Sequence, residues 1–188
     1  NRRSFLEPAG RLLGTPVEVI SGCEEAALIY AGAVPASATG SGPGQLVLDI
    51  GGGSTEVAVG REARPLRAES LSLGCIPLTR DYFPDGDMTA ERLGAAVQAV
   101  RGHASSALRP VRQHGWERAW GASGTVEAVT GLAGSLGALE ADGTLGPQGV
   151  AAVQEVLLAN PHAGQRAALP GVGHARAGVL PGGFAIVA

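Results

Sequence analysis

The feature that most constrains this chain is a run of three glycines between two apolar segments rich in β-branched residues. Gln45 to Ile50 (QLVLDI) is typical of a buried strand, Gly51 to Gly53 interrupt it, and Thr55 to Val59 (TEVAV) alternates as a second strand. Glycines between two strands predict a strand-to-strand turn. A dinucleotide-binding fingerprint would continue into a helix instead, so the pattern excludes the Rossmann turn.

Further patterns predict a mixed α/β chain around this turn. Ser21 and Glu24 form the pair of a capping box, which opens a helix through about Ala33. The small, Pro/Gly-rich segment 33–44 predicts a surface loop and a boundary between lobes. The other predicted elements are a helix over 1–14, strands over 17–20, within 67–73 and over 116–120, helices over 89–108, from 125 and over 147–159, and the beginning of a helix at the C-terminus.

Composition excludes several mechanisms. All 14 basic residues are Arg, so a Walker A loop, a Schiff-base lysine and the protein-kinase lysine are absent from this segment. The net charge of −3 argues against a nucleic-acid partner, and no apolar run predicts a membrane span. Cys23 and Cys75 lack the spacing of a zinc site or a disulfide framework, which predicts reduced thiols and a cytoplasmic location.

The glycine turn carries the residue types of a phosphate site. Gly51, Gly52 and Gly53 let backbone N–H groups approach an anion closely, and the hydroxyls of Ser54 and Thr55 follow directly. Asp49 before the turn and Glu56 after it could hold Mg²⁺ against that phosphate through oxygen ligands. The alternative is an ordinary glycine-rich hairpin turn.

Glu25 is the second candidate. Glu24 is explained as the capping-box partner of Ser21, whereas Glu25 lies about 100° further round the helix and has no capping duty. A carboxylate there, next to a phosphate site, could accept a proton from an attacking water. The alternative is a favourable charge at a helix N-terminus.

A second glycine motif follows the strand predicted over 116–120. Gly121, Ser123, Gly124 and Thr125 lead into the N-terminus of a helix, where unpaired N–H groups and the helix dipole favour an anion. The order GASGT does not fit the GxSxG nucleophile elbow of hydrolases. Ordinary strand-to-helix turn chemistry remains the alternative.

Four stretches of the chain, taken in order, carry a family resemblance. They are VEVISGCEEAALIYAGAV (17–34), LVLDIGGGSTEVAVG (46–60), SLSLGCIPLTRDYF (70–83) and WGASGTVEAV (120–129). Together they resemble the exopolyphosphatase and guanosine pentaphosphate phosphohydrolase family. The resemblance implies an α/β, ribonuclease-H-like lobe of the actin, Hsp70 and sugar-kinase type, with a mixed sheet flanked by helices and incomplete at both ends.

The resemblance also implies roles for the candidate residues. Glu25 matches the proposed general base, Asp49 an acid of the metal and phosphate site, and Glu56 the acid that closes the second phosphate motif. Residues 51–55 match the phosphate loop, and residues 121–125 match the later glycine motif. The implied reaction is Mg²⁺-assisted attack of water on a terminal phosphoanhydride phosphorus of polyphosphate or a guanosine polyphosphate.

Two departures from the family pattern shape the expectations. The family's first phosphate loop, of the Asp-Leu-Gly-Ser-Asn-Ser kind, has no match, and Gly178 stands where the family often has an acid. We therefore expect 1–35 to be the end of a first lobe with its connecting helix, and 36–188 a truncated second lobe, inactive alone. A non-catalytic nucleotide- or alarmone-binding module and a kinase of the same fold are the alternatives, and a homodimer is left open.

Overall fold

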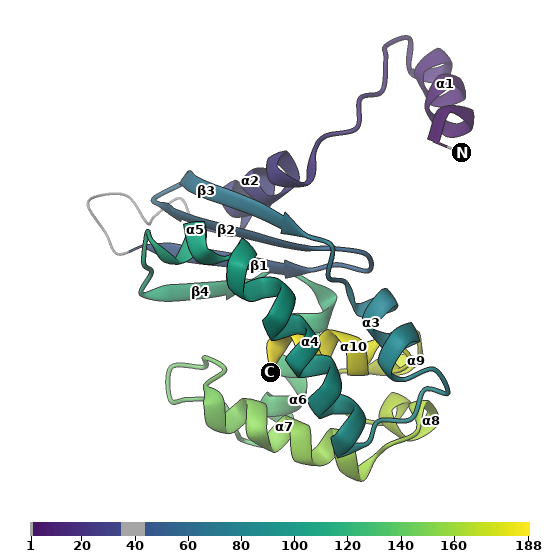
Figure 1. Ribbon diagram of the computed structural model, residues 1–188, viewed down its shortest axis with the longest axis vertical. Coiled ribbons are helices and arrows are strands. Elements are labelled where there is room, and N and C mark those ends of the chain that lie inside the picture. Colours follow the sequence, from purple (N-terminus) through teal and green to yellow (C-terminus); the bar gives the residue numbers. More distant parts are fainter. Residues whose placement is uncertain (1, 35–43) are drawn as a thin grey trace.

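The chain forms a four-stranded sheet, helices on both of its faces, and a further helical layer (Figure 1). The computed structural model describes residues 2–34 and 44–188, so most of the predicted loop over 33–44 lies outside the described residues. The elements in chain order are α1 (Arg2–Leu13), α2 (Gly22–Ala33), β1 (Gln45–Ile50), β2 (Thr55–Arg61), β3 (Arg64–Leu71), α3 (Cys75–Tyr82), α4 (Ala90–Ala107), α5 (Arg109–Arg112), β4 (Arg118–Gly121), α6 (Gly124–Ser135), α7 (Pro147–Ala159), α8 (Ala163–Ala167), α9 (Gly173–Ala177) and α10 (Leu180–Val187).

The sheet is mixed, as predicted, with the strand order β3-β2-β1-β4. β2 is antiparallel to both β1 and β3, whereas β1 and β4 are parallel. The glycines therefore lie in the turn of the first hairpin, between Ile50 and its register partner Thr55. The carboxyl ends of β1 and β4 point in the same direction, which places the segments that follow them at one edge of the sheet.

Helix α2 covers one face of the sheet, and α4 with α5 covers the other (Figure 1). Successive side chains of a strand point to opposite faces. Val47 of β1 and Ala58 of β2 accordingly pack against the buried Tyr30 of α2. Val57 and Val59 point the other way, into the cluster with α4 and α5. Two-residue periodicity thus decides which polar residues of these strands can meet α2.

A buried arginine connects segments of the helical layer through hydrogen bonds. Arg166 of α8 is 0% exposed, and its guanidinium donates to backbone carbonyls of three separate segments. Nη2 donates to Gly86 O (2.7 Å), Nε to Ala177 O (3.1 Å), and Nη1 to Pro161 O and to Asn160 O (3.4 Å). Buried carbonyls need donors, so this one side chain provides hydrogen bonds to carbonyls at the ends of several short elements.

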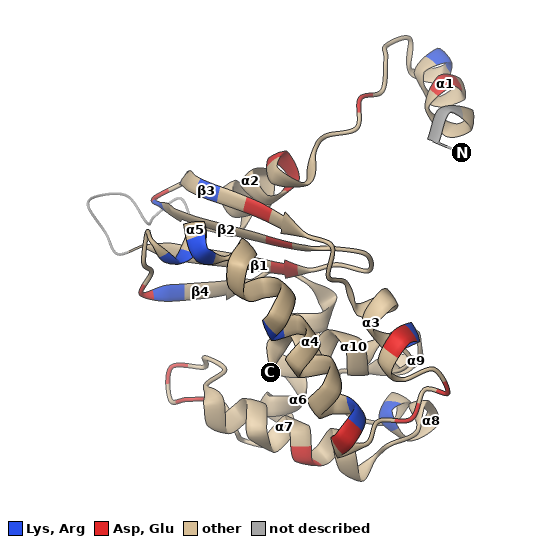
Figure 2. Ribbon diagram, viewed as in Figure 1, with Lys and Arg blue, Asp and Glu red and all other residues tan. Residues whose placement is uncertain are grey.

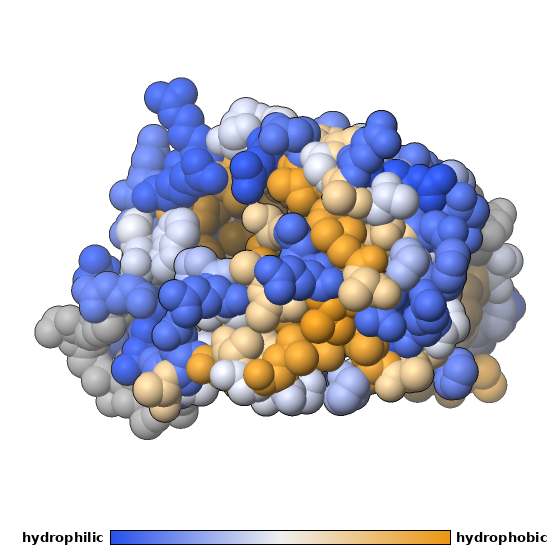
Figure 3. All heavy atoms as spheres, turned by 90° about the horizontal axis from the view of Figure 1, so that it is seen from below, coloured by the Kyte–Doolittle hydropathy of each residue, from blue (hydrophilic) through white to orange (hydrophobic). Residues whose placement is uncertain are grey.

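Seen from below in Figure 3, the molecule shows apolar surface between polar areas.

The N-terminal helix α1 stands apart from the sheet (Figure 1). Its Phe5, Leu12 and Leu13 are 70%, 88% and 68% exposed, so α1 contributes little to the core. No helix in the described ranges 2–34 and 44–188 is long and apolar enough to cross a membrane.

The strand predicted over 17–20 is wrong. The segment has no regular secondary structure, no strand among the described residues pairs with it, and Val19 and Ile20 are about half exposed. β-branched residues favour a strand only where a neighbouring strand pairs with the backbone and buries the side chains.

Other predicted elements are confirmed, namely the helices over 89–108 and 147–159 and the hairpin. Helices α3, α5, α8 and α9 were not predicted.

Candidate functional site

Three acids predicted from the sequence come together at one end of the sheet. Asp49 and Glu56 lie directly opposite each other in the β1–β2 ladder. By the alternation of the strands both point to the face covered by α2, where Glu25 lies in the first helical turn. Burial raises the pKa of Asp49, and the charges of Glu56 and then Glu25 raise it further. Figure 2 shows acidic positions of β1 and β2 side by side and acidic residues at the start of α2.

The start of α2 separates the roles of two neighbouring acids. Ser21 Oγ accepts the N–H of Glu24 (3.3 Å), and Glu24 Oε2 accepts the N–H of Ser21 (2.7 Å), which confirms the capping box. The N–H of Ser21, and after it the Ser21 hydroxyl, lower the pKa of Glu24 by hydrogen bonding to its carboxylate. Glu25 takes no part in the cap through its side chain, while its N–H donates to Ser21 O (2.9 Å) as the first helical bond. Its carboxylate is therefore left for the acid cluster.

The glycine loop turns its carbonyls toward α3. Cys75 N donates to Gly51 O (3.0 Å), and Ile76 N donates to Gly52 O (2.9 Å). Within the described part of the chain, the amides of Gly52 and Gly53 donate to no backbone carbonyl. The loop thus presents N–H groups on the side away from α3, which is the arrangement that favours an anion.

The loop geometry depends on a close approach by Gly74. A methyl group on Gly74 would overlap the carbonyl of Gly52 and the carbonyl carbon of Gly53. The turn is closed by Gly51 N, which donates to Ser54 O (2.9 Å). Ser54 is partly exposed at the turn, so its hydroxyl stays accessible beside the free amides.

Both predicted threonines place their hydroxyls inside the protein. Thr55 is 3% exposed, and its Oγ1 donates to Leu73 O (2.6 Å) on the face opposite to the acids. Thr125 is 0% exposed and lies beside the Cys75 thiol, under Gly183 of α10. The fold thus buries both hydroxyls, and their contacts with phosphate stay a prediction.

The second glycine motif brings in a basic residue that the sequence did not predict. Gly121 ends β4, and Ser123 is the N-cap of α6, with Oγ accepting the N–H of Val126 (3.3 Å). A side chain on Gly124 would overlap the guanidinium of Arg176, which therefore lies against the first turn of α6. The sequence signal that could have pointed to Arg176 is its place two positions before Gly178, where the family often has an acid.

The two glycine motifs lie at the same edge of the sheet. Leu48 of β1 and Gly121 of β4 are parallel register partners, and Ala122 N donates to Leu48 O (3.0 Å). The chain therefore leaves the adjacent strands β1 and β4 in the same direction, after Ile50 and after Gly121. In open α/β sheets, ligands bind outside the carboxyl ends of such strands.

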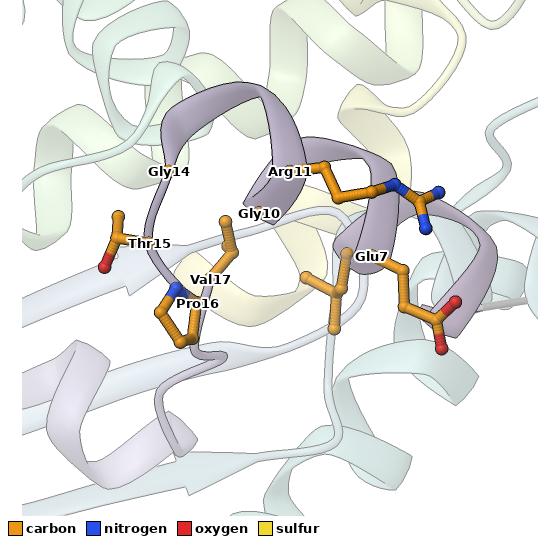
Figure 4. Close-up of a pocket in the computed structure, with 8 residues that line it drawn as sticks. Glu7, Gly10, Arg11, Gly14, Thr15, Pro16 and Val17 are labelled. Atoms are coloured by element: carbon orange, nitrogen blue, oxygen red, sulfur yellow. The ribbon is translucent and has the colours of Figure 1, made fainter.

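Other parts of the described structure are weaker candidates for a functional site. No group of three or more His, Cys, Asp or Glu side chains in the described residues gathers closely enough to hold a metal ion by protein ligands alone. A mostly apolar hollow lies between α1 and the segment 14–17 (Figure 4). In that view Glu7 and Arg11 extend away from Thr15 and Pro16. The hollow contains none of the predicted site residues.

Comparison with known structures gives the fold class. A crystal structure of an exopolyphosphatase-like protein matches with 28% identity and a TM-score of 0.80, covering 100% of this chain and 60% of that chain. The Aquifex aeolicus member of the Ppx/GppA family matches with 23% identity and a TM-score of 0.78, over 100% and 60% of the two chains. An exopolyphosphatase from Cytophaga hutchinsonii matches with 20% identity and a TM-score of 0.78, over 100% and 61%.

These relatives define the architecture as a mixed-sheet lobe of the actin-like fold, as expected. The chain spans about 60% of their length. The family model for the Ppx/GppA phosphatases matches residues 1–188. The chain belongs to the Ppx/GppA phosphatase family.

Proposed function

We propose that this chain forms part of the active site of a Mg²⁺-dependent phosphohydrolase that removes the terminal phosphate from inorganic polyphosphate or guanosine pentaphosphate. The observation that carries the proposal is the gathering of Asp49, Glu56 and Glu25 beside a glycine loop in which the amides of Gly52 and Gly53 donate to no backbone carbonyl of the described residues. Family membership supports a phosphatase-type reaction. Two of the similar structures are those of an exopolyphosphatase-like protein and of an exopolyphosphatase.

Glu25 is the proposed general base. It lies in the first turn of α2, free of the capping box, and its charge acts on Asp49. A carboxylate in that place would accept the proton of a water that attacks the terminal phosphorus. The amides of Gly52 and Gly53 and the exposed Ser54 would donate to phosphate oxygens.

Asp49 and Glu56 fit a Mg²⁺ ion. Mg²⁺ is commonly bound through one or two carboxylates, with waters and substrate phosphates completing the shell. Burial raises the pKa of Asp49, and the charges of Glu56 and Glu25 raise it further, so a cation beside Asp49 would offset that repulsion. When bound, Mg²⁺ would supply stabilisation of the charge on the phosphate oxygens.

The second glycine motif would bind another part of the phosphate chain. Arg176 lies against Gly124 at the N-terminus of α6, so a guanidinium and a helix dipole act at the same place. Arginine suits this role because its planar fork matches phosphate oxygens. In a segment without lysine, Arg176 would be a basic group available for phosphate recognition.

The test is phosphate release by the full-length protein from both substrates, with and without Mg²⁺. Glu25→Gln should lower kcat by about 10²-fold or more while ligand binding is kept, because only proton transfer is removed. The neighbouring Glu24→Gln is the matched control, since Gln also serves in a capping box. Unchanged turnover in Glu25→Gln would show that the general-base assignment is wrong.

A binding module without turnover is the second candidate. It would keep the glycine loop but has no use for a carboxylate aimed at the anion. Binding of guanosine pentaphosphate by the full-length protein, with no phosphate release under any Mg²⁺ concentration, would favour this candidate over the hydrolase.

The lobe division is also part of the proposal. We place the end of a first lobe and a connecting helix in 1–35 and the second lobe in 36–188, in keeping with α1 standing apart from the sheet. Residues 1–188 alone should then release no phosphate, since the relatives are longer. A rate equal to that of the full-length protein would contradict the proposal that residues 1–188 need the rest of the protein for activity.

A cytoplasmic location and a homodimer are further proposals, to be tested by cell fractionation and light scattering.

A further inference from the structure

A serine outside the predicted motifs holds the buried acid of the site. Ser70 Oγ donates to Glu56 Oε1 over 2.7 Å, and the two residues are register partners in the β2–β3 ladder. Glu56 is 4% exposed, so its carboxylate is almost removed from water. A buried carboxylate depends on the few donors that the protein provides.

The hydrogen bond decides where the second oxygen of Glu56 points. A methyl group on Gly51 would lie 4.0 Å from Glu56 Oε2, so this oxygen lies on the side of the glycine loop. Ser70 holds the other oxygen, Oε1, from the neighbouring strand. The carboxylate of Glu56 thus lies between β3 and the glycine loop, with Oε1 toward β3 and Oε2 toward the loop.

Ser70 also touches the start of α2. A side chain on Gly22, the first residue of the helix, would overlap Cβ and Oγ of Ser70. Since Ser21 to Glu25 form one capped turn, this contact limits how closely that turn can approach the sheet. Ser70 therefore lies between the carboxylate of Glu56 and the turn that carries Glu25.

We propose that Ser70 is a positioning residue that presents Glu56 Oε2 to a divalent cation at the edge of the glycine loop. The proposal rests on the proposed function, in which Glu56 is a metal ligand. It adds that affinity for the cation depends on a hydroxyl donor that does not touch the cation. Groups that orient ligands typically change metal affinity by about 10- to 100-fold when they are removed.

The test measures binding of Mn²⁺, as a spectroscopic substitute for Mg²⁺, to the full-length protein without substrate. Ser70→Ala should weaken Mn²⁺ binding by about tenfold or more. Ser72→Ala is the matched control, because Ser72 is exposed and two positions away. Glu56→Gln should weaken binding at least as much as Ser70→Ala. Each variant is compared at a temperature where circular dichroism shows it folded.

The outcomes separate the inference from the function on which it rests. If Glu56→Gln weakens Mn²⁺ binding and Ser70→Ala does not, the role of Ser70 is overturned and the metal site stands. If neither variant weakens it, the metal assignment fails, and the inference with it. Ser70→Thr keeps the hydroxyl and should keep most of the affinity. Binding as weak as in Ser70→Ala would show that the contact with Gly22, not the hydrogen bond, controls the site, which also overturns the proposal.

Discussion

Asp49 and Glu56 face each other across the first hairpin, and the charge of Glu56 raises the pKa of Asp49 after burial has already raised it. In the folded protein Asp49 therefore holds its proton to a higher pH than the ordinary 3.8. The stability that Asp49 contributes is fully present at pH values below its pKa in the unfolded chain. This contribution is lost as pH rises through the higher pKa that Asp49 has in the folded protein. At neutral pH the ionised group destabilises the fold.

Asp49→Asn should therefore raise the melting temperature at pH 7 in the presence of EDTA. We expect an increase of at most about 2–4 °C, which corresponds to roughly 1 kcal/mol in a domain of this size, because solvent screens part of the repulsion. The gain should shrink as pH falls toward 4. The exposed Glu155→Gln serves as control. A lower melting temperature for Asp49→Asn at pH 7 would contradict the repulsion.

Gly74→Ala should destabilise the protein and distort the glycine loop. The new methyl group overlaps the backbone of Gly52 and Gly53, which cannot swing aside like a flexible side chain. Overpacking of this kind costs about 1–3 kcal/mol. Gly94→Ala is the control, since Gly94 lies in α4 with open space around it, and it should gain about 0.5–1 kcal/mol. Urea unfolding measures both, and equal stability of Gly74→Ala and the wild type would refute the close approach.

Arg166→Ala should cost several kcal/mol of unfolding free energy. Each buried carbonyl left without a donor costs about 1–3 kcal/mol, and this guanidinium serves the carbonyls of Gly86 and Ala177. Pro161 O also accepts from this guanidinium but keeps the N–H of Met88 as a second donor. Arg166→Lys should recover only part of the loss, because an ammonium lacks the planar fork. The exposed Arg109→Ala should change little. Urea denaturation would rule out this role if the two alanine variants were equally stable.

The two thiols should react at very different rates. Cys23 is exposed, whereas Cys75 is 3% exposed and burial raises the pKa of its thiol, although the charge of Arg176 acts in the opposite direction. Because the thiolate is the reactive form, a disulfide reagent should label one thiol quickly in the native protein and the second only after unfolding. Cys23→Ser should remove the fast phase. Two fast thiols in the native wild type would show that Cys75 is accessible.

Local patterns predicted the elements whose signals lie within them. The capping pair Ser21 and Glu24 sits one turn apart, and the hairpin follows from alternation around three glycines. Helix α3 could not be predicted because its first amides are satisfied by carbonyls of the distant Gly51 and Gly52. The strand expected over 17–20 failed for the converse reason, since pairing depends on a partner that the local pattern does not contain.

The candidate site shows the same limit. The sequence placed Asp49 and Glu56 on either side of the turn, and the two-residue period put both on the face of α2. The burial of the Thr55 hydroxyl depends on Leu73, which is remote in sequence. The position of Arg176 against Gly124 depends on how α9 returns to α6. Such contacts between distant segments are properties of the assembled fold.

The carbonyl contacts of Arg166 have a consequence for motion. One side chain ties the loop at Gly86, the end of α7 near Pro161 and the end of α9 at Ala177, and Met88 N also donates to Pro161 O (3.0 Å). None of these stretches can open alone without breaking bonds of the others. Their amides should therefore exchange with deuterium as one cooperative unit, at a common opening free energy. The helical layer that presents Arg176 would then open and close as a single body.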